Sequence, residues 1–153
     1  MKKDLQNQII TNLVYLTQTD TTIGFISQSP QRLTQIKQRP PHKHYIIALP
    51  SLEQLNSFTR VPTKHKNRVR RSQKTSFIFP NMHSYRVIKN SPHTHLLSKL
   101  GWAYTTSANL SGREYDEVFA KESADILVGF PQTKSSGASS IFKLGVKGIK
   151  RVR

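Results

Sequence analysis

The stretch AYTTSANLSGRE (residues 103–114) joins a strand-like run to a loop of small and polar residues. The β-branched and aromatic residues of 103–107 favour a strand, and the segment from Ala108 onward favours a loop. Ligands of α/β proteins commonly bind at the ends of strands. We therefore interpret Ser107 and Asn109 as candidate ligand-binding residues, because a hydroxyl and an amide can orient the oxygens of a phosphate.

Two further segments contain groups suited to phosphate. Lys37 and Arg39 follow a predicted short helix, and SGASS (136–140) is a second loop of small residues. Lysine supplies a compact charge and arginine a planar fork for phosphate oxygens. The glycine-rich patterns GxxxxGK[ST] and GxGxxG are both absent from the sequence, so neither of the common nucleotide-binding loops is predicted.

The remaining sequence alternates between strand-like runs and short helices, with a hydroxyl-rich loop at 19–24. Strands are predicted at residues 13–18, 44–49, 75–79, 84–88, 103–107, 125–129, 139–144 and 148–153. Helices are predicted from Ser29-Pro30 to Ile36, from Ser51, from Ser91-Pro92 to Gly101 and near 116–124. This order predicts an α/β fold with a mixed sheet, in a single domain over residues 1–153 with no second domain.

Composition excludes several kinds of site. The chain has no cysteine, which excludes thiol nucleophiles and cysteine-ligated zinc. Its six histidines form no HExxH pattern and have no carboxylate close by in the sequence, so neither a catalytic triad nor a metal site is predicted. No apolar run is long enough to span a bilayer. We therefore expect no membrane partner and a cytoplasmic location.

The charge of the chain is strongly unbalanced. Its 153 residues include 24 Lys and Arg against 8 Asp and Glu, a formal net charge of +16, and no acid lies between residues 54 and 113. Such a segment presents a positive field to polyanions. The candidate RNA-binding residues are Arg60, Lys64, Lys66, Arg68, Arg70, Arg71 and Lys74. A lid over a bound nucleotide and a solvated basic loop are alternative interpretations of the same segment.

Several short motifs, taken in order, resemble the YrdC/TsaC family, the threonylcarbamoyl-AMP synthases of tRNA modification. The segments that carry the resemblance are QTDTTIGF (18–25), IKQRPPHK (36–43), RRSQKT (70–75), YRVI (85–88), TTSANLSG (105–112), SGASSIF (136–142) and IKRVR (149–153). The KxRP and TSANxSG patterns are the most diagnostic of these. The chain departs from the family at Gln18, where the family has proline, and at residues 72–74, where it has Pro-Gly-Pro.

The resemblance implies a twisted mixed sheet with short flanking helices around a positively charged concave cavity. It also implies a nucleotidyltransferase that joins L-threonine, bicarbonate and ATP into threonylcarbamoyl-AMP and pyrophosphate. Mg²⁺ would be carried by ATP, with no metal ligated by the protein. Proteins of a threonylcarbamoyl-transferase complex would then pass the threonylcarbamoyl group to an adenosine of tRNA.

The same resemblance implies roles for individual residues. The expected catalytic and ATP-binding residues are Lys37, Arg39, Ser107 and Asn109. Further ATP contacts are expected from Ser139, Ser140 and Arg151. Contacts to threonine are expected from Thr19, Thr21 and Arg86. Replacing Lys37 or Asn109 by alanine is expected to abolish activity with little change in melting temperature.

Two alternatives remain open from the sequence. A non-catalytic module that binds double-stranded RNA or tRNA on the same fold would explain the net charge of +16 through contacts to phosphates. The second alternative is a related carbamoyl-adenylate enzyme with a different acceptor. The intact KxR and SAN motifs favour the synthase, because an RNA binder needs positive charge but no such loop.

Overall fold

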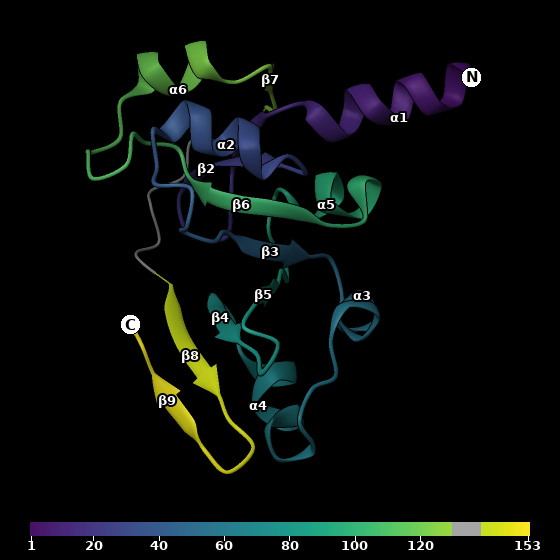
Figure 1. The fold of residues 1–153 in the computed structure, drawn as a ribbon, viewed down its shortest axis with the longest axis vertical. Helices are drawn as coiled ribbons and strands as arrows, with labels where there is room; N and C mark the ends of the chain where they lie inside the picture. Colours follow the sequence, from purple (N-terminus) through teal and green to yellow (C-terminus); the bar gives the residue numbers. More distant parts are fainter. Residues whose placement is uncertain (130–138) are drawn as a thin grey trace.

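The computed structural model describes residues 1–129 and 139–153, and within them the strands form one mixed sheet (Figure 1). The strands are β1 (Tyr15–Gln18), β2 (Ile23–Ser27), β3 (Ile46–Leu49), β4 (Thr75–Ile78), β5 (Ser84–Val87), β6 (Ala103–Ser107), β7 (Ile126–Leu127), β8 (Ser140–Leu144) and β9 (Ile149–Arg151). Their order across the sheet is β7-β1-β2-β6-β3-β5-β4-β8-β9. The pairs β1·β7, β3·β5 and β4·β8 are parallel, and the other neighbours are antiparallel. The predicted α/β class with a mixed sheet is confirmed.

Short helices connect these strands. They are α1 (Lys2–Asn12), α2 (Pro30–Lys37), α3 (Leu52–Phe58), the 3-10 turn η1 (Thr63–His65), α4 (Lys66–Arg71), α5 (Thr94–Leu100) and α6 (Glu117–Ser123). Ser29 caps α2 by accepting a hydrogen bond from Arg32 N, and Ser51 caps α3 by accepting one from Gln54 N, as predicted. Among the described residues, no helix has the length and apolar character needed to cross a membrane.

The two faces of the sheet differ because successive side chains along a strand point to opposite sides. On one face, Phe77 and Tyr85 pack under α3 and α4, and Phe25 packs under α2 and α6. On the other face, Ile26 and Ala48 pack with Leu97 of α5. Helix α5 does not extend along this second face to Arg86 or Ser107, and the candidate site lies there.

Several predicted elements need correction. Strand β2 was not predicted, and it includes residues 23 and 24, which were expected to be loop, because it pairs with β1 from Ile23 and with β6 from Gly24. The basic segment contains η1 and α4, held to the core by the buried Val69. Helix α5 begins at Thr94 with His93 as its N-cap, not at Ser91-Pro92. Helix α1, which the sequence did not predict, buries none of its residues.

Candidate functional site

A cavity of about 490 Å³ opens on the sheet face that α5 leaves uncovered. It brings together six of the residues expected to bind substrates, from five separate segments of the chain. These are Thr19, Thr21, Arg39, Arg86, Ser107 and Ser139. Strands β5 and β6 place Arg86 and Ser107 in the wall, because both lie on the same face of the sheet. The cavity is thus lined largely by hydroxyl and guanidinium groups.

The turn between β1 and β2 shapes one wall of the cavity. Thr19 holds it closed: its Oγ1 donates to Thr22 O at 2.6 Å, and its backbone N donates to the same oxygen at 2.9 Å. The backbone N–H groups of Thr21 and Thr22 in turn donate to Thr19 Oγ1. Gly24 lies in β2, just after this turn. A Cβ there would lie 2.8 Å from Thr106 O and 2.9 Å from Thr19 Cγ2. Only glycine lets this turn pack so closely against β6.

A buried ion pair fixes Arg86 in the cavity wall. Its NH1 lies 3.2 Å from Asp20 Oδ1, and the two side chains are 5% and 8% exposed. Its Nε donates to Ser76 Oγ at 2.8 Å. Burial lowers the pKa of Arg86, the Asp20 carboxylate raises it, and the charge of Arg153 lowers it. The guanidinium is therefore held rigidly, with a second arginine close enough to act on it.

Lys37 is hydrogen-bonded to the loop that follows β6 and holds that loop in place. Its Nζ donates to the carbonyl oxygens of Ser107 and Asn109, each at 2.7 Å, and to Asn109 Oδ1 at 3.4 Å. Burial, and after it the charge of Arg39, lower the pKa of Lys37 to about 8. The amide of Asn109 is also occupied, since its Nδ2 donates to Leu110 O and Arg113 O. In this structure, both residues shape the loop and do not line the cavity.

Arg39 remains available at the cavity mouth. Its guanidinium stacks on the ring of Tyr45 at 4.6 Å from the centroid, and one nitrogen donates to His44 O at 3.0 Å. Both His44 and Tyr45 line the same cavity. Stacking leaves the edge of a guanidinium free to donate hydrogen bonds to the oxygens of an anion.

The carboxyl-terminal strand presents a different arginine from the one expected. Arg153 lines the cavity, and its guanidinium donates to Ser139 Oγ at 3.0 Å and to Ser139 O at 3.3 Å. The N–H groups of Val152 and Arg153 both donate to Ile141 O, which inserts an extra residue opposite Ile141. Strand alternation therefore breaks after Arg151, which pairs with Phe142. Ser140 and Arg151 lie outside the cavity lining, and residues 136–138 of the predicted loop lie outside the described residues.

His93 is a buried residue that the sequence did not single out. Its Nδ1 lies 2.6 Å from Ser91 Oγ, and its Nε2 is buried with no hydrogen-bond partner. Burial lowers the pKa of His93 to about 4, while Asp20 raises it and Arg86 lowers it. His65 is also buried, with its Nε2 2.9 Å from Gly145 O.

Sequence reasoning missed Asp20, Arg153, His44 and Tyr45. Asp20 could have been found as the lone acid in a loop otherwise built of threonine and glutamine. Arg153 could not, because the bulge that turns it inward depends on pairing with β8. In the described part of the chain, no group of three or more acidic or histidine side chains is placed to hold a metal ion.

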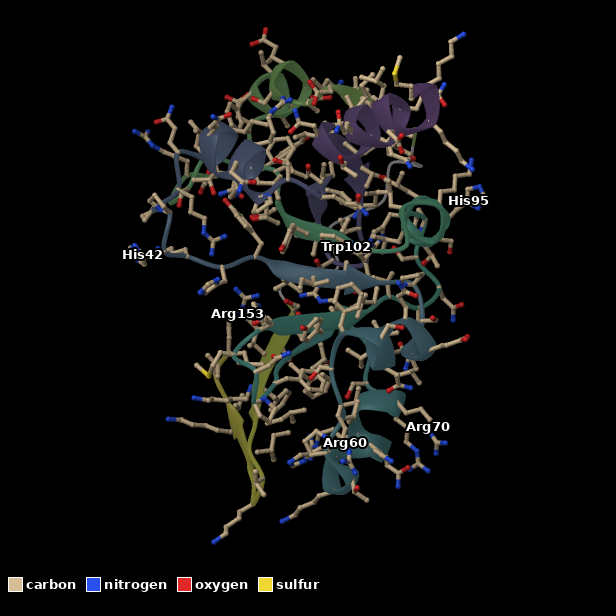
Figure 2. All side chains as sticks on the ribbon, turned by 45° about the vertical axis from the view of Figure 1, so that its right-hand side comes forward. His42, Arg60, Arg70, His95, Trp102 and Arg153 are labelled. Atoms are coloured by element: carbon tan, nitrogen blue, oxygen red, sulfur yellow. The ribbon has the colours of Figure 1, made fainter. Side chains whose placement is uncertain are left out.

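The predicted RNA-binding residues lie away from this cavity. Six of them lie in or close to η1 and α4, and Figure 2 shows Arg60 and Arg70 in the lower part of the molecule, below Arg153. Lys74 lines a second, smaller cavity of about 280 Å³ together with Asp20 and Lys89. None of the expected RNA contacts lines the larger cavity, but Lys74 shares the smaller one with Thr19, which lines both.

Comparison with curated proteins finds relatives of unknown activity. The uncharacterized protein MG259 of Mycoplasma genitalium is 28% identical over 160 residues, covering 97% of this chain and 34% of that protein. Its homologue in Mycoplasma pneumoniae is 30% identical over 150 residues, covering 87% of this chain and 30% of that protein. The chain therefore spans about a third of the length of these relatives.

Solved structures share the fold. Sua5 of P. abyssi, in a H234A/Y235A variant, superposes with a TM-score of 0.82 at 15% identity, over 99% of this chain and 56% of that one. The same protein complexed with L-threonine gives a TM-score of 0.79 at 17% identity, over 97% of this chain and 52% of that one. E. coli YciO gives 0.73 at 17% identity, over 99% and 89%. The family model Sua5/YciO/YrdC, described as telomere recombination, matches residues 14–153, and the chain belongs to this family.

Proposed function

We propose that the chain is an L-threonylcarbamoyladenylate synthase that serves the modification of tRNA. The observation that carries the proposal is the cavity in which Arg39, Arg86 and Arg153 line one space with eight threonines and serines. Such a lining suits a substrate with several negative charges and one small zwitterion. The family to which the chain belongs supports the same activity.

The proposed reaction has two bond-forming steps. The amino group of threonine combines with bicarbonate, with loss of water, to give a carbamate. A carbamate oxygen then attacks the α-phosphorus of ATP, and the bond to the β-phosphate oxygen breaks to release pyrophosphate. No side chain needs to act as a nucleophile, so catalysis rests on positioning and on neutralising the charge that develops at phosphorus.

We assign the cavity residues to two of the three substrates, ATP and threonine. Arg39 and Arg153 lie at positions where their guanidinium groups can meet the phosphates, and Ser107 and Ser139 can donate hydroxyl hydrogen bonds to them. Arg86, held by Asp20, is placed to receive the carboxylate of threonine or the carbamate. A Sua5 of this fold has been solved with L-threonine, which supports threonine as the amino acid.

Magnesium would enter with ATP. The described residues offer no carboxylate cluster for it, and Mg²⁺ is commonly held by phosphate oxygens and water with few protein ligands. Bound there, the ion would neutralise charge on the leaving pyrophosphate. The protein residues would bind and orient the rest of the substrate.

Pyrophosphate release from ATP by the purified protein tests the proposal. Release should require L-threonine and bicarbonate together, and omitting either should reduce it to background. Release that is independent of threonine would contradict the assignment and favour a carbamoyl-adenylate enzyme with another acceptor.

An RNA-binding module without catalysis is the second candidate. The observation that favours it is the net charge of +16, with no acid between residues 54 and 113. On that account tRNA or double-stranded RNA would be the partner, and ATP would not be hydrolysed under any combination of substrates. If the synthase proposal holds, tRNA and the proteins of a threonylcarbamoyl-transferase complex would instead be the users of its product.

A further inference from the structure

The end of the molecule that contains α4 and the β8–β9 hairpin has an unusual charge distribution (Figure 1). Besides the acid-free run from 54 to 113, the sequence has no acid after Asp125. The fold therefore combines two segments that lack carboxylates, although α4 ends at Arg71 and β8 begins only at Ser140.

Direct contacts join the two segments. Lys64 Nζ donates to Lys147 O at 2.9 Å, and the His65 ring lies 2.9 Å from Gly145 O. The Arg68 guanidinium lies over the Phe142 ring at 5.6 Å from its centroid. The helix and the hairpin thus form one continuous surface, which we call the basic end.

The exposed cations of the basic end come from both segments. The helical segment contributes Arg60, Lys64, Lys66, Arg68, Arg70 and Arg71. The hairpin contributes Lys143, Lys147, Lys150 and Arg151. Within residues 1–129 and 139–153, none of these cations forms an ion pair with a carboxylate. The positive charge here is therefore not neutralised within the described structure.

The β8–β9 hairpin brings like charges close together, which lowers its stability. Lys143 lies directly opposite Lys150 in the β8–β9 register, and like charges in such a pair repel each other. Arg151 pairs with Phe142 and so lies on the other face, the face on which Arg68 packs. Cations consequently occupy both faces of the hairpin and the adjoining helix.

We propose that the basic end binds the phosphate backbone of folded RNA through its exposed lysines and arginines, none of which lines the cavity. A charged backbone that runs past the hairpin and α4 can place phosphates near both faces, whereas a flat anionic bilayer meets one side only. The spread of charge over two elements suits contacts to the backbone more than to sequence. Val146 at the hairpin turn is 82% exposed, so an anionic membrane is the rival occupant that the test must address.

The proposal predicts a strong dependence on salt, because each phosphate contact releases bound counterions. The test uses the full chain and a fluorescently labelled tRNA transcript, with anisotropy measured across a salt series. The variant replaces Lys143, Lys147 and Lys150 by Gln, and the matched control replaces Lys2, Lys3 and Lys99 by Gln. Both variants lose three exposed positive charges, so the net charge is the same.

The hairpin variant should bind RNA at least about tenfold more weakly near physiological salt, and its slope of log affinity against log salt should fall by about 2–3. The control should keep most of the wild-type slope. A second variant on the helix side, with Lys66, Arg70 and Arg71 replaced by Gln, should show the same loss as the hairpin variant.

Three results would overturn the proposal: equal losses in the hairpin variant and the control, no RNA binding by the wild type, or capture by vesicles containing phosphatidylglycerol that tRNA does not compete away. Pyrophosphate release by the hairpin variant should match the wild type, because its three lysines lie outside the cavity lining. The RNA surface and the proposed synthase can therefore fail independently.

Discussion

Gly24 is the residue on which the close approach of the 19–22 turn to β6 depends. Replacing it by alanine places a Cβ 2.8 Å from the backbone oxygen of Thr106, which cannot rotate away. We expect Gly24→Ala to lower the free energy of unfolding by about 1–3 kcal/mol, as overpacking does in a tight core. Denaturant unfolding measures the loss. Gly129→Ala is the control, since nothing lies within 4 Å of a Cβ at that position, and an equal loss in both would contradict the account.

His93 makes the stability depend on pH in the acid range. In the unfolded chain its imidazole takes up a proton near pH 6.5, whereas in the fold its pKa is lowered to about 4, chiefly by burial. As the pH falls from 6.5 towards 4, the unfolded state binds a proton that the folded state does not, so this contribution to stability is progressively lost.

The measurement is the melting temperature of the wild type, His93→Gln and His95→Gln between pH 7 and pH 4.5. His93→Gln should show a shallower loss on acidification than the wild type. His95→Gln removes an exposed histidine and should keep the wild-type dependence. Parallel pH profiles for all three proteins would show that His93 is not the group responsible.

At the scale of elements, the junction of α2 with the loop after β6 depends on one buried amine. Lys37 Nζ has three acceptors in that loop, and hydrogen bonds to a charged donor contribute more than neutral ones. We expect Lys37→Met to lose activity and also to lower stability by roughly 2–4 kcal/mol, because the loop carbonyls lose their donor. This expectation differs from the prediction, drawn from the sequence, that replacing Lys37 by alanine leaves the melting temperature nearly unchanged.

Thermal unfolding and pyrophosphate release of Lys37→Met, beside Lys99→Met, test this role. Lys99 is exposed on α5 and outside the cavity lining, so its variant should behave as the wild type. If Lys37→Met kept its full melting temperature while losing activity, the residue would act on the substrate directly and the loop would not need it as a tether.

The sequence predicted most elements whose local signals agree with their packing. The continuous apolar run at 44–49 contains β3, and the Ser-Pro and Ser-x-x-Gln signals located the starts of α2 and α3. It missed α4 because a single buried valine, Val69, is the only apolar residue of that helix. It missed β2 because the hydroxyl-rich turn before the strand is typical of a loop, and the strand is defined by pairing with β1 and β6.

The candidate site was predictable to a similar degree. Short motifs indicated Thr19, Arg39 and Ser107, and the fold places all three in one cavity. The Asp20–Arg86 pair joins residues 66 positions apart, and a single sequence carries no local sign of such a contact. The burial of Lys37 could not be predicted either, since it depends on where the loop after β6 runs.

For the whole molecule, we propose that catalysis belongs to the cavity and RNA contacts to the basic end. The two regions adjoin at the β8–β9 hairpin, where Ile141, Val152 and Arg153 line the cavity, but the exposed cations assigned to the basic end lie outside that lining. Charge removed from one region should therefore leave the function of the other intact. Arg39 is the best single probe of the cavity, because its side chain lies at the mouth and is not buried in the core.

The most direct test is the incorporation of labelled bicarbonate into an adenylate, measured with ATP and L-threonine for the wild type, Arg39→Gln and Lys99→Gln. The wild type and Lys99→Gln should form a labelled threonylcarbamoyl-AMP at equal rates. Arg39→Gln should be slower by about a hundredfold or more, the loss expected when one donor to a developing charge is removed. No labelled adduct from the wild type, or equal rates in all three proteins, would contradict the assignment of catalysis to this cavity.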